Sequence, residues 1–129
     1  TKKNKKMDHG IEVLKGKTLT NVIVDREGDE KITFYTTDGD VYIMQHHQDC
    51  CESVVIDDIN GDLTMLIGSV ILTASERVRV SGDDDDDGYQ ESNTWTFYYI
   101  STLHETVSIK WWGSSNGYYS ESVSFDKVD

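Results

Sequence analysis

The chain has 129 residues and carries 24 acidic against 12 basic side chains, which gives a formal net charge of −12 at pH 7. This length predicts a single domain that can bury a core without disulfides or metals. The acidic balance argues against binding nucleic acid through its phosphates, because that binding depends on Lys and Arg. No apolar run approaches the roughly 18 residues that a membrane-spanning helix needs.

The first residues are expected to lie outside the folded core. Thr1–Lys6 is basic and no apolar segment follows it, which is not the pattern of a secretory signal. We therefore expect a flexible basic arm over residues 1–10 and a single β-rich domain over residues 11–129.

The first part of the domain is rich in β-branched residues, which favour strands. We expect strands over Leu19–Asp25, Lys31–Thr36 and Val41–His46. Asp38-Gly39 separates the last two, and this pair tolerates the positive φ angles of a tight hairpin turn. Residues 31–46 are therefore predicted to form a β-hairpin.

The rest of the chain continues this pattern. Further strands are expected over Ser53–Ile56, Val70–Ala74, Glu76–Val80, Thr94–Thr102, Thr106–Trp112 and Tyr118–Phe125. Asp62 can cap a short helical turn near residues 63–67, and no long amphipathic helix is indicated. The predicted fold class is mainly β, with about seven to eight short strands in antiparallel hairpins that form a sandwich or an open barrel.

Residues 81–92 interrupt the strand pattern. They contain five consecutive aspartates, Asp83–Asp87, between two glycines. Five adjacent like charges repel one another, so we expect a solvated acidic loop. A calcium site is the alternative, but the run lacks the alternating ligand spacing of an EF-hand loop.

The densest group of reactive side chains is the segment from His46 to Glu52, HHQDCCE. If the strand continued through it, His47, Asp49 and Cys51 would share one face, and the intervening residues would share the other. Such a set could bind a metal, since His, Cys and carboxylates are metal ligands. Two other interpretations are a cysteine nucleophile, which the flanking acids disfavour, and a hydrogen-bonded structural network.

Cys50 and Cys51 are neighbours in the sequence. Adjacent strand residues point to opposite faces, so a bond between the two sulfurs would strain the backbone. We therefore expect two free thiols and a reducing, cytoplasmic environment, with an intermolecular disulfide as the alternative.

Aromatic pairs mark the last third of the chain. Trp111-Trp112 and Tyr118-Tyr119 flank a loop that contains Asn116-Gly117. One member of each pair is expected to face outward, where Trp and Tyr favour binding. A polyphosphate could be held only if Arg77, Arg79 or Lys110 converged on a pocket.

The motifs QHHQDCCESVVIDDINGD, IGSVILTASE, ESNTWTFYYIST and IKWWGSSNGYYSESVSF resemble a small family of uncharacterised domains carried by bacteriophages and prophages. The resemblance covers about residues 16–125 and departs from the family at Val70, where a proline is expected, and at Asp83–Asp87, which looks like an insertion. It implies a phage context and action inside the host cell. The residues it shares with the family are His47, Gln48, Asp49, Cys50, Cys51, Glu52, Ser115, Asn116, Gly117, Tyr118, Tyr119 and Glu121.

These observations favour a small cytoplasmic phage accessory protein that binds a host protein or a small signalling ligand and thereby inhibits host defence, without catalysis or a cofactor. Direct binding to nucleic acid or membrane is not expected, and a homo-oligomer is possible. The predicted binding residues are His47, Gln48, Asp49, Glu52, Trp112, Ser115, Asn116, Tyr118, Tyr119 and Glu121. The alternatives are a metal-dependent hydrolase that uses His47, Asp49, Cys51 and Glu52, and a structural or assembly protein of the virion.

Overall fold

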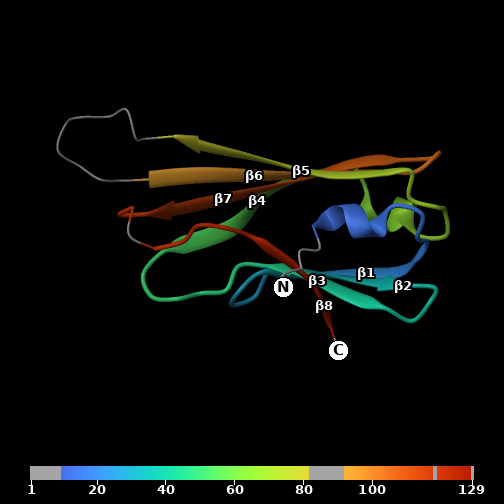
Figure 1. The fold of residues 1–129 in the computed structure, drawn as a ribbon, viewed down its shortest axis with the longest axis horizontal. Coiled ribbons are helices and arrows are strands. Elements are labelled where there is room, and N and C mark those ends of the chain that lie inside the picture. Colours follow the sequence, from blue (N-terminus) through green and yellow to red (C-terminus); the bar gives the residue numbers. More distant parts are fainter. Residues whose placement is uncertain (1–9, 82–91, 118, 129) are drawn as a thin grey trace, which may run out of the picture.

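Two antiparallel four-stranded sheets pack face to face in the computed structural model, which describes residues 10–81, 92–117 and 119–128 (Figure 1). The strands are β1 (Leu19–Asp25), β2 (Lys31–Thr36), β3 (Val41–Gln45), β4 (Ser53–Asn60), β5 (Thr73–Ser81), β6 (Ser92–Ser101), β7 (Thr106–Ser115) and β8 (Ser124–Val128). One sheet has the order β1-β2-β3-β8 and the other β4-β7-β6-β5. The predicted mainly β fold is therefore confirmed, and among the described residues the sheets form no closed barrel.

The first sheet contains the predicted hairpin. β2 and β3 pair in register from Lys31 with Gln45 to Tyr35 with Val41. Gly39 lies in the turn between them at φ +88°, a region that an L side chain rarely occupies. Alternate side chains of β2, including the fully buried Phe34, point into the core.

In the second sheet, two strands have boundaries that differ from the predicted ones. The predicted strand over Val70–Ala74 begins only at Thr73 and continues without a break through Glu76–Val80 as the single strand β5. β4 continues beyond Ile56 through Asp57 and Asp58, with an irregularity in its pairing with β7 between Ile56 and Asp58. These carboxylates are exposed, so the strand can continue without burying their charge.

Two segments, which we call the crossing segments, connect the sheets: one where the predicted strand Val41–His46 could have continued, and one within the predicted last strand. Residues 46–52 leave β3 of the first sheet and enter β4 of the second. The predicted last strand, Tyr118–Phe125, begins only at Ser124, because the residues before it return from β7 to the first sheet. A chain that passes between two sheets leaves the hydrogen-bonded ladder, so a side-chain alternation expected for one strand does not apply there.

The core lies between the sheets and includes two 3₁₀ helices. These are η1 (Ile11–Leu14) and η2 (Leu63–Leu66), which lie toward one end of the molecule between the layers (Figure 1). Asp62 accepts a hydrogen bond from the backbone N–H of Thr64 at 3.0 Å, as predicted for the cap of η2. The largest fully buried side chains include Trp111, Tyr98, Phe34, Met44 and Leu66.

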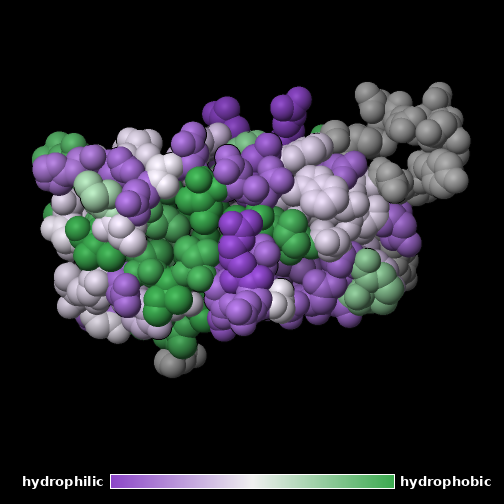
Figure 2. Space-filling model, turned by 180° about the vertical axis from the view of Figure 1, so that it is seen from behind, coloured by the Kyte–Doolittle hydropathy of each residue, from purple (hydrophilic) through white to green (hydrophobic). Residues whose placement is uncertain are grey.

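The surface is not uniformly polar. The side of the molecule opposite to the view of Figure 1 has hydrophobic residues gathered in its middle, bordered by hydrophilic ones (Figure 2).

In the described part of the chain, no helix is long and apolar enough to cross a membrane. The predicted arm, apart from Gly10, and the acidic run Asp83–Asp87 lie outside the described residues.

Gly113 is predicted to be a sensitive position in β7. A Cβ atom placed there would lie 2.8 Å from Cβ of Glu121 and 3.0 Å from its carbonyl oxygen. We expect Gly113→Ala to lower the free energy of unfolding by about 1–3 kcal/mol, because the backbone at Glu121, in the segment that returns from β7 to the first sheet, must move to make room for the added methyl group. Urea denaturation checks this, with Ser114→Ala as the neighbouring control. Equal stability of the two variants would contradict the close approach.

Candidate binding site

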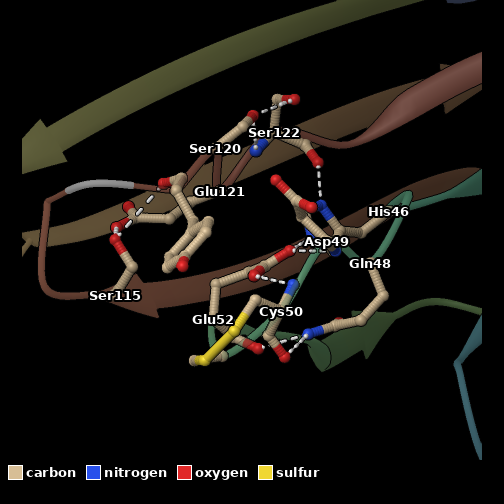
Figure 3. A network of polar contacts seen from close by, with 11 residues as sticks. His46, Gln48, Asp49, Cys50, Glu52, Ser115, Ser120, Glu121 and Ser122 are labelled. Atoms are coloured by element: carbon tan, nitrogen blue, oxygen red, sulfur yellow. Dashed lines mark hydrogen bonds and ion pairs between the residues drawn. A yellow bond between two sulfur atoms is a disulfide. The ribbon is translucent and has the colours of Figure 1, made fainter.

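The two crossing segments meet in a network of polar contacts (Figure 3). Nδ1 of His46 lies 2.6 Å from the carbonyl oxygen of Ser122, and Nε2 lies 2.7 Å from Oε2 of Glu52. His46 and Glu52 are both buried. Each ring nitrogen of His46 thus faces an oxygen atom of another residue. His46 therefore joins the first crossing segment to the second.

Glu52 closes the loop through residues 46–52. Its carboxylate accepts the backbone N–H of Asp49 at 2.7 Å and that of Cys50 at 3.0 Å. Burial alone would raise the pKa of Glu52, but the hydrogen bond from His46 and those from the two backbone N–H groups outweigh it and lower the pKa from 4.5 to about 2. The ionised carboxylate is thus fully engaged in holding the loop.

Glu121 is a second buried carboxylate in this region. It accepts hydrogen bonds from Oγ1 of Thr94 at 2.6 Å and from Oγ of Ser92 at 3.3 Å. Oγ of Ser115 also donates to it, and the same oxygen accepts the backbone N–H of Gly117 at 2.9 Å. Ser115 and Glu121 were predicted to bind a ligand, and in the structure they bond to each other at the end of β7 (Figure 3).

Cys50 and Cys51 are joined by a disulfide, so the prediction of two free thiols is wrong. The prediction assumed a strand, in which adjacent side chains diverge. These residues instead lie in the loop between the sheets, where the backbone has no ladder to follow. Both residues are exposed.

His47, Gln48 and Asp49 are exposed, and the loop does not gather its side chains into a metal-binding group. His47 lies 3.4 Å from Oδ2 of Asp126 in β8, while Gln48 donates to the carbonyl oxygen of Glu52 at 2.7 Å. Asp49 is exposed, whereas the Glu52 carboxylate is buried against His46. Across the described residues, no group of three or more His, Cys, Asp or Glu side chains could hold a metal ion. The ligand set proposed for a hydrolase is not assembled.

The predicted residues after β7 divide between surface and boundary positions. Asn116 is exposed and Tyr119 is half-buried, and the carbonyl oxygen of Tyr119 accepts a hydrogen bond from Oγ of Ser115 at 3.3 Å. Tyr118 lies outside the described residues. These residues therefore extend the network toward the surface.

Trp112 occupies a different face from this network. Its neighbour Trp111 is buried, and Trp112 points outward from β7, as predicted for one member of the pair. Trp112 pairs across the sheet with Trp95 of β6, and its Nε1 donates to Oδ1 of Asn93 at 3.2 Å. Phe97 and Tyr99 follow Trp95 on the same side of β6, with ring centroids 6.3 Å apart and planes 8° from parallel.

We call the four outward rings of Trp95, Phe97, Tyr99 and Trp112 the aromatic face. Basic side chains flank it on both sides. Arg79 of β5 pairs with Trp95, and Lys110 of β7 pairs with Phe97. Arg79, Trp95, Phe97 and Lys110 together line a shallow hollow of about 330 Å³. Of the three basic residues considered above for binding a polyphosphate, Arg79 and Lys110 therefore converge on one pocket.

Sequence reasoning singled out Trp112 on this face and missed its three aromatic neighbours in β6. The signal was present, because Trp95, Phe97 and Tyr99 alternate with Thr96 and Tyr98, which are buried. Such alternation marks one face of a half-buried strand. A high content of strand-forming residues predicts the strand but does not give the direction of each ring.

Comparison with known proteins gives a family without an assigned activity. No curated protein and no solved structure matches the chain. A family model described as a domain of unknown function, DUF7448, matches residues 12–125. This match spans both sheets, the crossing segments and the aromatic face. The chain belongs to the DUF7448 family.

Proposed function

We propose that this protein is a phage-type accessory protein that binds and sequesters a host factor without catalysing a reaction. The buried carboxylates of the crossing segments are already held by hydrogen bonds within the protein. Glu52 is bonded to His46 and to two backbone N–H groups, and Glu121 is bonded to three hydroxyl groups. Groups held in this way fix the geometry of a fold.

The aromatic face is the observation that carries the proposal. Its rings are partly accessible, with Tyr99 exposed to 38%. Aromatic and Arg side chains supply most of the energy at binding surfaces, because they bury a large area with few rotatable bonds. The regular, rigid sheet beneath them also limits the conformational entropy lost on binding. A surface of this kind suits recognition of a partner rather than bond cleavage.

The test is the ability of the protein to protect a phage inside a bacterial host. The chain is expressed in strains that carry different antiphage defences, and phage plating efficiency is measured. We expect the wild type to restore plating in at least one strain, and the double variant Phe97→Ala, Trp112→Ala to lose this effect. Tyr35→Ala is the matched control, because it removes a half-buried ring from the outer face of β2 in the other sheet.

The variants are first compared by circular dichroism and thermal unfolding, so that loss of the fold is recognised. Full protection by the folded double variant would show that the aromatic face is not the binding surface. Absence of protection by the wild type in every strain would overturn the anti-defence role.

A further inference from the structure

We propose that the hollow beside the aromatic face binds a nucleotide, with its base stacked on the rings of β6 and its phosphate held by Arg79 and Lys110. This inference rests on the proposed function, because it names the ligand class of the same face. The hollow combines two aromatic and two cationic side chains, and a nucleotide combines a flat base with an anionic phosphate.

The strand register places the rings in a platform. Trp95 lies between Arg79 of β5 and Trp112 of β7, and Phe97 occupies the adjacent row beside Lys110. Same-face residues along a strand are about 7 Å apart, which leaves room for a flat base over one ring. Stacking of bases on aromatic side chains of a sheet is a common mode of recognition and accepts any base.

The two cations lie on either side of β6, and both line the hollow, so both can reach a phosphate that lies over it. Nζ of Lys110 lies 6.0 Å from the centroid of Phe97 and 3.4 Å from Oδ2 of Asp57. The Lys110–Asp57 pair is partly exposed, and such pairs contribute at most about 1 kcal/mol, so a phosphate can replace the carboxylate. Arg79 is exposed on the other side of β6 and can donate two parallel hydrogen bonds to phosphate oxygens.

The size of the hollow and the charge of the chain favour one nucleotide over a nucleic acid strand. A volume of about 330 Å³ is at the lower end of the range for small-ligand sites. The net charge of −12 opposes a long polyanion, and exposed Asp57 and Asp58 lie on the strand beside β7. At physiological salt the screening length is about 8 Å, so a single phosphate at the hollow responds mainly to its nearest charges.

The experiment titrates the full chain with adenosine monophosphate, guanosine monophosphate, adenosine and inorganic phosphate, and follows tryptophan fluorescence and binding heat. We expect saturable quenching by both nucleotides, weaker binding of adenosine, and no quenching by phosphate alone. Phe97→Ala should weaken nucleotide binding by roughly 5- to 150-fold, the range for loss of one stacked base. Arg79→Gln should weaken binding of the nucleotides but leave that of adenosine unchanged.

Lys127→Gln in the other sheet is the matched control, since it removes one positive charge away from the hollow. An equal loss of affinity in this variant would overturn the site, because it would indicate only a general charge effect. Tighter binding of a single-stranded oligonucleotide than of a mononucleotide would overturn the assignment to one nucleotide.

The two proposals fail in different ways. If no nucleotide binds but phage protection still depends on Phe97 and Trp112, the ligand class is wrong and the binding face stands. If nucleotides bind with the expected variant pattern but no strain is protected, the site stands and the proposed role in the host is wrong.

Discussion

Trp111→Ala is expected to lower the free energy of unfolding by about 3–5 kcal/mol, the usual cost of removing a large aromatic side chain from a core. Trp111 is only 1% exposed and points from β7 of the second sheet toward the first. Its Nε1 donates to Sδ of Met44 in β3 at 3.2 Å. The variant therefore loses contacts between the two sheets and leaves a cavity between them.

Trp112→Ala is the natural control, because it removes the same side chain from the next residue. Trp112 faces outward, and its one described hydrogen bond, to Asn93, is worth about 1 kcal/mol. We expect urea denaturation to give a much smaller loss of stability for Trp112→Ala than for Trp111→Ala. Similar losses would contradict the assignment of the two rings to opposite faces of β7.

Glu52→Gln is expected to flatten the dependence of stability on pH in acid. The pKa of Glu52 is about 2 in the folded protein and 4.5 as its ordinary value. A carboxyl group whose pKa is lowered by folding stabilises the fold fully above its unfolded pKa. That contribution is lost as the pH falls from about 4.5 through about 2. The variant should thus be less stable than the wild type at neutral pH, and the difference should shrink across this window.

Urea denaturation at a series of pH values from neutral down to about 2 measures this effect. Asp38→Asn is the variant for comparison, because a hydrogen bond from Lys17 lowers the pKa of Asp38 to about 2 as well. Asp38 lies in the β2–β3 turn, so the two variants should flatten the profile independently and the double variant should flatten it further. A difference between wild type and Glu52→Gln that does not change with pH would contradict the proposed network.

The parts of the fold that depend on local sequence could be predicted. The hairpin over residues 31–46 follows from Asp38-Gly39 and its flanking β-branched strands, and the cap of η2 follows from Asp62. The loop over residues 46–52 could not be predicted in the same way. Its conformation depends on a bond from His46 to Ser122, which lies 76 residues later in the chain. The disulfide went unpredicted because a strand was assumed there.

In the candidate site, too, some features follow from local sequence and others depend on contacts between distant parts of the chain. The outward direction of Trp112 follows from alternation along one strand, and so do the directions of the three rings of β6. The hollow requires more, because Arg79 and Lys110 belong to different strands and meet only through the order β5-β6-β7. Sequence patterns give the face of each residue, but they do not give the neighbour of each strand.

The pairing of β3 with β8 has a consequence for the synthesis of this protein. Val41 pairs with Val128 and Gln45 with Ser124, so the first sheet contains strands from opposite ends of the domain. The ribosome makes β1, β2 and β3 first and β8 last. Until β8 is made, the backbone N–H and C=O groups along one edge of β3 have no strand beside them, and such an edge can pair with another nascent chain. Rapid translation on crowded polysomes would therefore favour aggregation at this stage, whereas the completed chain covers the edge with its own last strand.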